Sequence, residues 1–496
     1  MVSGRSGWVR GWVLRAPSDE LTDDFTQKLG YTFALWLAER LHTDTDKLCV
    51  AVGHDARPSG ERLTRAFIDG LTAADADVYD CGLATTPAMH LAIKLENVHA
   101  HGAAMITASA LDDSMNGFKL FSPDGAVTDE EMAEIFERSQ HVSVPHRLVT
   151  KLNLADMYAE RLKAHVHEFM SDSSPDPLKG LHVVVDASCG TGGFFAKMLE
   201  ELGADTHGSF NLEPVGGRTS NPENPEALEM LSTVVLREKA DIGVIFDADA
   251  DRVAIVDNRG RVINRNRLIA LIAAILLEDE QGLTFVTDSV TSSGLSRFIT
   301  EWGGSHYRYR RGYRNVIDEA RRLSAEGYNV PIAIETSGHA AMAENYFIDD
   351  GVYLATNVIC EAKWRKRDSL TLSSLIDELQ EPVESLAVRL PIIQDDYKKA
   401  AGYVIQAVLS ESLTNPEWRL APDNREGLRI LFSLDGGTDN AWFMLRLSVH
   451  DPVMAVNAES EVPGGLKHVI SQLYAVLERD NEELDLSPLR VEIDKL

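Results

Sequence analysis

The stretch ADIGVIFDADADRVAIVD, residues 240–257, decides the organisation of the chain. An apolar run rich in β-branched residues ends at Asp247, and a second one begins at Val253. Two such runs predict buried strands joined by a short acidic loop. In that loop Asp247, Asp249 and Asp251 alternate with alanines, which places three carboxylates on one side of an extended segment. Three carboxylates so close together repel one another unless a cation lies among them.

The same pattern recurs along the chain. Short apolar runs that lead into polar loops are separated by segments with helical periodicity, and this alternation predicts parallel α/β sheets. In such sheets the ligand site lies beyond the carboxyl ends of the strands, so we expect the chemistry in these loops. The other predicted strands are KLCVAVGHD (47–55), LHVVVDAS (181–188), LTFVTD (283–288) and VPIAIE (330–335).

Chain length and composition breaks predict several domains. A chain of 496 residues suggests roughly three to four domains. The segment 427–451 alternates as antiparallel strands do and is followed by an amphipathic helix. We therefore predict an α/β protein of three α/β domains with mixed or parallel sheets and a smaller C-terminal α+β domain. The predicted domains span residues 1–148, 149–262, 263–382 and 383–496.

Composition excludes several classes of partner. With 48 basic and 77 acidic residues, the net charge of −29 argues against nucleic acid or an anionic membrane surface. The longest apolar run, residues 268–277, is half the length of the about 20 residues that a membrane span needs. Four cysteines without a CxxC pair fit reduced thiols in a cytoplasmic protein.

The acidic loop favours a magnesium site. Oxygen-only ligands suit Mg²⁺, which shares its coordination shell with phosphate oxygens and water. An EF-hand loop would need Gly at position six and Glu at position twelve, where this chain has Arg252 and Asn258. A solvated acidic turn is the alternative, which the apolar strands on both sides disfavour.

A second candidate is ITASALDDSMNGFKLF, residues 106–121. It presents Ser109 after an apolar run, and Lys119 follows the pair Asn116–Gly117. A serine in this setting is either a nucleophile or an ordinary turn or helix-cap residue, and this stretch alone does not decide.

Two further segments carry sugar- and phosphate-binding residue types. Glu335, Ser337 and His339 surround a glycine at a predicted strand end and suit hydrogen bonds to vicinal hydroxyls, although a helix cap explains the serine equally well. Arginine forks match phosphate geometry, although a solvated face is the more common role of such a run. The arginines of YRYRRGYRNVI, residues 307–317, are Arg308, Arg310, Arg311 and Arg314.

The glycine-rich stretch DASCGTGGF, residues 186–194, looks like a nucleotide-binding loop. It is not a GxGxxG sequence, and no convincing acidic partner for a ribose follows it. We expect its glycines to let a helix pack closely on a sheet.

Taken in order, these motifs resemble the α-D-phosphohexomutase family, in particular its bacterial phosphoglucomutase/phosphomannomutase branch. The resemblance covers nearly the whole chain. It is carried by GWVRG, VGHDARPSG, GLATTPAM, ITAS with NGFK, DADADR, ETSGH and DGGTDN. It implies the predicted four-domain fold, arranged around a central cleft.

The resemblance also implies a reaction. Ser109 would be a phosphoserine that donates its phosphoryl group to a hexose phosphate and takes another back through a sugar 1,6-bisphosphate. Ser109 and the three aspartates would hold Mg²⁺, with Arg252 beside them. Lys119 and His339 would be the general acid/base candidates.

The substrate residues follow from the same resemblance. Glu335 and Ser337 would bind hydroxyls that glucose and mannose share, which leaves glucosamine phosphate as a less favoured substrate. Arg10 lies in the matching N-terminal loop, and Arg310 and Arg311 align with a loop that helps to bind the sugar phosphate. The partner would be a hexose phosphate, and the protein a monomer or homodimer.

The chain departs from the family pattern after its serine. The family commonly has His-Asn-Pro there, whereas this chain has Ala110, Leu111 and Asp112. Loss of the imidazole and the added carboxylates of Asp112 and Asp113 are expected to weaken phosphoserine stabilisation by like-charge repulsion.

A second departure concerns the last phosphate loop, usually Arg-x-Ser-Gly/Asn-Thr in the family. We match it to LDGGT, residues 434–438, which has no arginine. Backbone N–H groups of Gly436 and Gly437, followed by Thr438, would cradle phosphate there. Arg446 or the cluster 308–314 would supply the missing charge, and the sequence does not choose between them.

Two functions remain open from sequence. One is an active Mg²⁺-dependent phosphosugar mutase. The other is a catalytically weakened homologue that binds phosphosugar as a regulatory module. Retention of the serine, the aspartates, Lys119, Glu335 and His339 favours the first, because a decayed site would be expected to lose its metal ligands as well.

Overall fold

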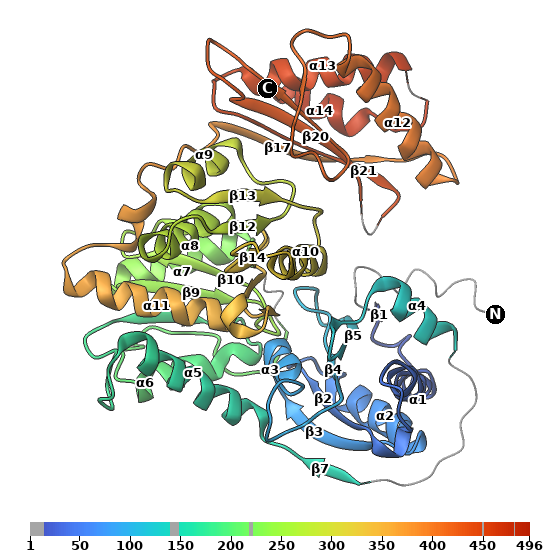
Figure 1. Cartoon of the computed structure of the whole chain (residues 1–496), viewed down its shortest axis with the longest axis vertical. Helices are drawn as coiled ribbons and strands as arrows, with labels where there is room; N and C mark the ends of the chain where they lie inside the picture. Colours follow the sequence, from blue (N-terminus) through green and yellow to red (C-terminus); the bar gives the residue numbers. More distant parts are fainter. Residues whose placement is uncertain (1–13, 139–147, 218–221, 449–450, 481) are drawn as a thin grey trace. The chain divides into compact units, whose positions relative to one another are not determined.

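The computed structural model describes residues 14–138, 148–217, 222–448, 451–480 and 482–496 (Figure 1). By contacts the chain divides into two compact units. The first contains the chain up to Asn264 together with Ser337–Ser374, and the second contains Arg265–Thr336 and Leu375–Leu496. Residues 337–374, which follow β14, therefore pack with the N-terminal half of the chain.

The first sheet of the first unit is mixed. Its order is β1-β5-β4-β2-β3-β7, with β6 paired to β5. β2 runs parallel to β3 and β4, whereas β5 is antiparallel to β4 and β1. Its elements are β1 Leu14–Pro17, α1 Asp23–Arg40, β2 Cys49–His54, α2 Gly60–Ala73, β3 Asp77–Leu83, α3 Thr86–Leu91, β4 Gly102–Ile106, β5 Met115–Ser122, β6 Gly125–Ala126, α4 Asp129–Glu137 and β7 Val149–Lys151, with a short 3₁₀ helix η2 at Thr45–Lys47.

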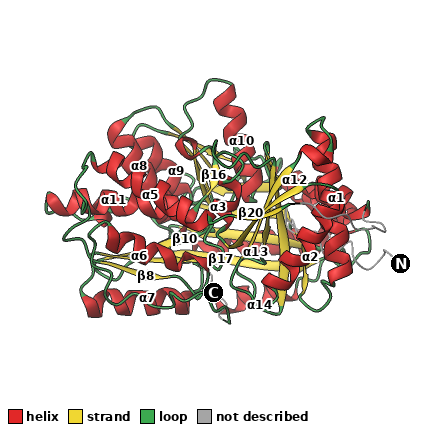
Figure 2. Ribbon diagram, turned by 90° about the horizontal axis from the view of Figure 1, so that it is seen from below, coloured by secondary structure: helices red, strands yellow, loops and turns green. Residues whose placement is uncertain are grey.

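The second sheet has the order β11-β10-β9-β8, with β8 and β9 parallel and the rest antiparallel. β8 and β10 lie between α7 on one side and α5 and α6 on the other (Figure 2), while α11 packs on α5, β9 and β10. The elements of this sheet and its helices are α5 Leu154–Met170, β8 Val183–Asp186, η3 Thr191–Gly193, α6 Phe194–Glu201, α7 Pro225–Glu238, β9 Ile242–Phe246, β10 Val253–Asp257, β11 Val262–Ile263 and α11 Gly351–Arg367. The first unit also contains β15 Ala340–Met342, η4 Ala343–Asn345 and β16 Ile348–Asp349, of which β15 and β16 pair antiparallel and belong to another sheet.

The second unit contains the parallel strands β13, β12 and β14 and an antiparallel sheet of order β17-β21-β20-β19-β18. One face of the antiparallel sheet packs on α12 and α13, and the other packs Leu431, Trp442 and Met444 against Val290. The elements are α8 Arg265–Asp279, β12 Thr284–Thr287, α9 Ser293–Glu301, β13 Ser305–Arg308, α10 Tyr313–Ala325, β14 Ile332–Ile334, β17 Glu384–Pro391, α12 Tyr397–Ser412, β18 Arg419–Leu420, β19 Leu428–Phe432, β20 Ala441–Leu447, β21 Val453–Ser460, α13 Gly465–Asp480 and α14 Ser487–Lys495, with η5 at Leu372–Ile376.

Short polar side chains start the helices. Thr22 accepts a hydrogen bond from the Phe25 N–H at the start of α1, and Asp350 accepts one from the Tyr353 N–H at the start of α11. Each satisfies a backbone donor that the first helical turn leaves unpaired. Asn224 does the same before α7, where Pro225 fits the first helical position.

The predicted fold class is confirmed: three α/β domains with mixed sheets precede a further sheet-rich C-terminal domain. The domain boundaries and the central cleft stay predictions. Within the predicted third domain, residues 337–374 pack into the first unit. Among the described residues, no helix is both long and apolar enough to cross a membrane, and all four cysteines are free.

Helices α1 and α2 pack unusually closely through two glycines. A Cβ atom at Gly70 would lie 1.9 Å from the Gln27 carbonyl oxygen, and one at Gly30 would lie 2.3 Å from the Phe67 oxygen. Backbone oxygens cannot move aside as the end of a flexible side chain can. Any larger residue at these positions therefore pushes the two helices apart.

Gly70→Ala should lower the free energy of unfolding of α1 and α2 by about 1–3 kcal/mol, because of this overpacking. Native-state hydrogen exchange of their amides measures the change. Gly402→Ala is the matched control. Gly402 lies inside α12 with open space around it, so alanine should stabilise that helix by about 0.4–1 kcal/mol. Unchanged exchange in Gly70→Ala would contradict the close packing.

Candidate active site

Ser109 lies in the loop that follows β4. Its φ of 55° is in the left-handed region, which a non-glycine residue occupies only when its surroundings impose it. The Ser109 N–H donates to Thr107 Oγ1 at 2.8 Å, and only 3% of the residue is exposed. The loop therefore holds this hydroxyl in a fixed, buried position.

Arg57 fastens the serine loop. Its guanidinium is buried, and its Nε donates to Asp55 at 2.9 Å. The remaining N–H groups are used on loop carbonyls. The acceptors are the carbonyl oxygens of Ser109, Leu111 (2.8 Å), Asp112 (2.7 Å) and Met115 (3.3 Å). Only the planar fork of an arginine reaches so many acceptors from one side chain.

The two aspartates added after the serine are engaged in the loop structure. Asp112 accepts from the Ser114 N–H at 2.9 Å. Asp113 accepts from the Gly217 N–H, which joins the serine loop to the second domain of this unit. Repulsion between these carboxylates and a phosphoserine stays a prediction.

The three aspartates lie in the loop between β9 and β10, and all three are buried. The glycine-rich stretch 186–194 packs against the loop that holds them. Thr191 donates to the Ala248 carbonyl from its N–H at 2.9 Å and from its hydroxyl at 3.1 Å. A Cβ atom at Gly190 would lie 2.4 Å from the same oxygen. This stretch thus contacts the acidic loop itself, in addition to packing on the sheet.

Serine and aspartates meet in the first unit. Ser109 Oγ donates to Asp247 Oδ2 at 3.0 Å, although the two residues are 138 positions apart. One carboxylate oxygen from each of Asp247, Asp249 and Asp251 lies within 4.8 Å of the others. The hydroxyl and the three carboxylates form one buried cluster.

Two cations balance the cluster. Lys119 Nζ contacts Asp249 at 2.6 Å and Asp251 at 2.5 Å. Arg252 Nε donates to Asp247 at 2.8 Å, and its Nη2 donates to Ser109 Oγ at 3.2 Å. Both cations are nearly buried, so little solvent screens these ion pairs.

Burial and charge divide the pKa values of the aspartates. Burial raises the pKa of Asp247 to about 6, against the opposing charge of Arg252. Burial also acts on Asp249, but there the charge and hydrogen bond of Lys119 prevail and hold the pKa well below its usual range. Asp251 has a raised pKa because it is buried and lies beside Asp249.

The donor set fits a divalent cation. The Oδ1 atoms of Asp249 and Asp251 are buried and have no hydrogen-bond partner among the described residues. Thr86 binds the other oxygen of Asp249 and so orients that carboxylate. Free oxygens on oriented carboxylates suit Mg²⁺, which takes oxygen ligands only.

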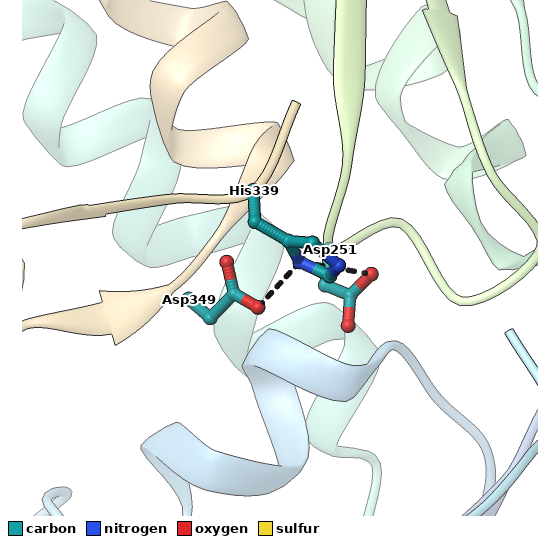
Figure 3. Close-up of side chains that lie close together, drawn as sticks. All are labelled: Asp251, His339 and Asp349. Carbon is teal, nitrogen blue, oxygen red and sulfur yellow. Dashed lines mark hydrogen bonds and ion pairs between the residues drawn. The ribbon is translucent and has the colours of Figure 1, made fainter. Parts of the chain in front are cut away.

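His339 joins the cluster from the turn that precedes β15 (Figure 3). Its Nδ1 lies 2.7 Å from Asp349 Oδ2 and 3.8 Å from Asp251 Oδ1. Burial alone would lower the pKa of His339, but the two carboxylates raise it to about 9. Gly338, at φ 94°, lies against the Val253 backbone and leaves no room for a Cβ atom, so this turn stays close to β10.

Other predicted substrate residues gather in the second unit. Glu335 accepts from the Gly312 N–H at 2.6 Å, beside the Arg311 loop. Arg446 Nη1 lies 3.9 Å from Glu426, which also accepts from the Arg311 N–H at 3.1 Å. Burial lowers the pKa of Arg446. The carboxylates of Glu426 and Glu335 oppose that shift, and the charge of Arg311 adds to it. Glu335, Arg311, Arg446 and Glu426 form what we call the sugar-phosphate cluster.

The remaining candidates are Arg310, Ser337 and Arg10. Arg310 Nε donates to the Arg425 carbonyl at 3.4 Å. Ser337 is buried and belongs to the first unit, unlike Glu335. Arg10 lies outside the described residues.

The structure does not bring Gly436, Gly437 and Thr438 to Arg446. β19 pairs with β20 so that Phe432 faces Ala441 at the loop that holds the glycines. Arg446 lies at the far end of β20, about 17 Å away at the usual rise per residue. The glycine loop and this arginine therefore cannot form one phosphate site.

Sequence reasoning missed a better match for the phosphate loop. Arg446-Leu447-Ser448 fits the first three positions of the family's Arg-x-Ser pattern and ends β20. The arginine was already visible in the sequence, but a glycine pair looked more like a phosphate cradle. The next two residues, 449 and 450, lie outside the described residues.

A buried serine against three aspartates, carried by three α/β domains, defines the phosphohexomutase class. Models of the phosphoglucomutase/phosphomannomutase α/β/α domains I, II and III match residues 6–143, 156–260 and 264–383. The chain belongs to this family.

Relatives carry the names of several hexose specificities. A phosphoglucomutase/phosphomannomutase of Thermococcus kodakarensis is 30% identical over 90% of this chain and 92% of its own. A phosphoglucosamine mutase of Rhodospirillum rubrum is 31% identical over 95% of this chain and 97% of its own. The crystal structure of a phosphoglucomutase/phosphomannomutase family protein from Burkholderia thailandensis shares the fold, with a TM-score of 0.79 at 22% identity over 97% of this chain and 99% of that one.

Arg57→Lys should loosen the serine loop, because a lysine cannot serve Asp55 and four carbonyls together. We expect amide hydrogen exchange across residues 108–115 to become at least about tenfold faster. Arg65→Lys is the control, since Arg65 is exposed and pairs only with Glu61 among the described residues. Equal exchange in both variants would contradict the positioning role of Arg57.

Proposed function

We propose that the protein is an active phosphohexomutase that moves a phosphoryl group between O1 and O6 of glucose or mannose phosphate. A phosphoserine at Ser109 and a sugar 1,6-bisphosphate are the intermediates. The observation that carries the proposal is the contact of Ser109 Oγ with Asp247 at 3.0 Å and Arg252 at 3.2 Å. A decayed binding module would not be expected to keep a buried cluster of three aspartates, a lysine and an arginine around one hydroxyl.

The reaction has two transfers. In the first, the bond between phosphorus and Ser109 Oγ breaks as a sugar hydroxyl bonds to phosphorus and loses its proton to a base. The bisphosphate then reverses its orientation in the site. Ser109 Oγ bonds to the phosphorus of the other phosphoryl group as the bond from that phosphorus to the sugar oxygen breaks, and the sugar oxygen takes up a proton. Such transfers need mainly positioning and neutralised charge on the phosphoryl oxygens.

The residues of the first unit divide these tasks. Arg252 donates to Ser109 Oγ and stabilises negative charge on that atom as the phosphoryl group leaves. Ser109 and the three aspartates would hold Mg²⁺, which supplies neutralising charge to the phosphoryl oxygens when bound. Lys119 and His339 both contact the aspartate cluster and are the proposed proton-transfer groups. Because the pKa of His339 is raised to about 9, it carries a proton at neutral pH and acts as the proton donor to a leaving oxygen.

In the second unit the sugar-phosphate cluster is suited to the rest of the substrate. Arg446, with Ser448 after it, anchors the phosphate that is not transferred, in place of the glycine loop of residues 436–438. Glu335 accepts hydrogen bonds from sugar hydroxyls. Glucose and mannose share those hydroxyls, so both are proposed substrates. The cytoplasm is the proposed compartment, since free thiols are usual there.

The proposal is tested by interconversion of 1- and 6-phosphates of glucose, mannose and glucosamine, each with Mg²⁺ and the matching 1,6-bisphosphate. We expect turnover with glucose and mannose phosphates and slower turnover with glucosamine phosphate. Turnover of glucosamine phosphate alone would overturn the substrate assignment. Binding without turnover of any of them would favour the regulatory module.

Ser109→Ala should reduce turnover by at least about 10³-fold, because the nucleophile is lost. Binding of Mn²⁺, followed by electron paramagnetic resonance, should survive, since the three carboxylates remain. Ser114→Ala is the control, because its hydroxyl lies in the same loop on Asp112, and it should keep wild-type turnover. A fully active Ser109→Ala variant would show that another group accepts the phosphoryl.

A further inference from the structure

The second unit contains a cavity of about 480 Å³ that the proposed reaction does not use. It lies where the start of α9 and β13 meet β18 and β19. Its volume is in the range of small-molecule pockets, about 300–1,000 Å³. Four arginines line it, namely Arg297, Arg308, Arg419 and Arg429, together with Ser293, Ser296, Thr438 and the acidic residues Asp423 and Asp439.

Arg429 is the most buried of the four arginines of this cavity. It is 3% exposed, and its guanidinium stacks on Trp442 at 3.7 Å. Its Nη1 donates to the carbonyls of Ser289 and Thr291, both at 3.0 Å. Its Nη2 is buried and has no hydrogen-bond partner among the described residues. A buried, charged N–H donor without an acceptor calls for one, such as an anion.

The other arginines already have partners. Arg308 contacts Asp423 at 2.5 Å, and Arg297 pairs with Glu461. Arg419 pairs with Asp439. Burial, and after it the charge of Arg308, lower the pKa of Arg429 well below its usual value, while the carboxylates of Asp423, Glu459 and Asp288 oppose the shift. The two neighbouring guanidiniums repel each other, and a bound anion would add to the relief that these carboxylates give.

Helix α9 adds donors at the same wall. Ser292 caps the helix by accepting from the Leu295 N–H at 3.0 Å. Ser293 and Ser296, in the first turn, line the cavity, and the Ser296 hydroxyl also bonds to His306 Nδ1 at 2.5 Å. A helix start carries partial positive charge and favours anions.

We propose that this cavity binds the phosphate of a small phosphorylated molecule, at a site separate from the reaction centre, between Arg429 and the start of α9. The site goes beyond the mutase reaction and does not depend on it. The loop that follows β12 contacts both this site and the sugar-phosphate cluster. Ser289, whose carbonyl binds Arg429, donates its hydroxyl to Glu426, which also accepts from the Arg311 N–H.

The test measures binding of inorganic phosphate to the full-length chain by isothermal titration calorimetry. The background variant is Ser109→Ala with Arg446→Met, which lacks the reacting hydroxyl and the cation of the sugar-phosphate cluster. We expect one phosphate to bind per chain. Glycerol 3-phosphate should displace it with at least equal affinity, as a site for phosphorylated molecules requires.

Two variants in this background test the residues. Arg429→Met keeps an apolar stem on Trp442, and Ser293→Asp adds a carboxylate to the cavity while favouring the helix start. Each should weaken phosphate binding at least tenfold. Arg267→Met is the control for lost surface charge, because Arg267 pairs with Glu381 in the same unit.

The outcomes are decisive in both directions. No phosphate binding in the background variant, unchanged binding in Ser293→Asp, or failure of glycerol 3-phosphate to compete would overturn the site. Because the background variant cannot transfer a phosphoryl group, such a failure leaves the proposed mutase activity untouched. Loss of mutase activity would, conversely, say nothing against this cavity.

Discussion

Charge balance among buried groups is the constraint on which the first unit depends. Burying each carboxylate costs on the order of several kcal/mol of desolvation, which nearby cations must offset. Lys119 comes from β5 and Arg252 from the start of β10, so each sheet supplies one cation to the shared cluster. Thr86 adds a hydrogen bond from a third element. The two sheets are therefore held together by the same groups that do the chemistry.

The same buried charges also distinguish the Ser109 hydroxyl from those of the other serines. Ser109 is one of many serines, but its left-handed backbone, its contact with Asp247 and its contact with Arg252 occur together. A phosphoryl group on this oxygen adds negative charge beside Arg252, whose guanidinium is already in place. The arrangement is paid for in folding, so the reaction needs little rearrangement.

Local patterns in the sequence predicted the strands, the acidic loop and the candidate serine, because strand periodicity and residue spacing are local properties. The positioning role of Arg57 could not be predicted, since the loop carbonyls that it binds lie more than 50 positions away. The packing of residues 337–374 with the first unit is likewise tertiary. The phosphate loop was matched to Gly436 and Gly437 on composition, and only the β19–β20 register separates them from Arg446.

The most direct measurement is the intact mass of the purified protein after incubation with glucose 1,6-bisphosphate and Mg²⁺, followed by peptide mapping. If a single hydroxyl among those buried carboxylates is the phosphoryl carrier, one added phosphoryl group will map to the peptide that contains Ser109. A protein that gains none, or gains it on another peptide, would contradict the account.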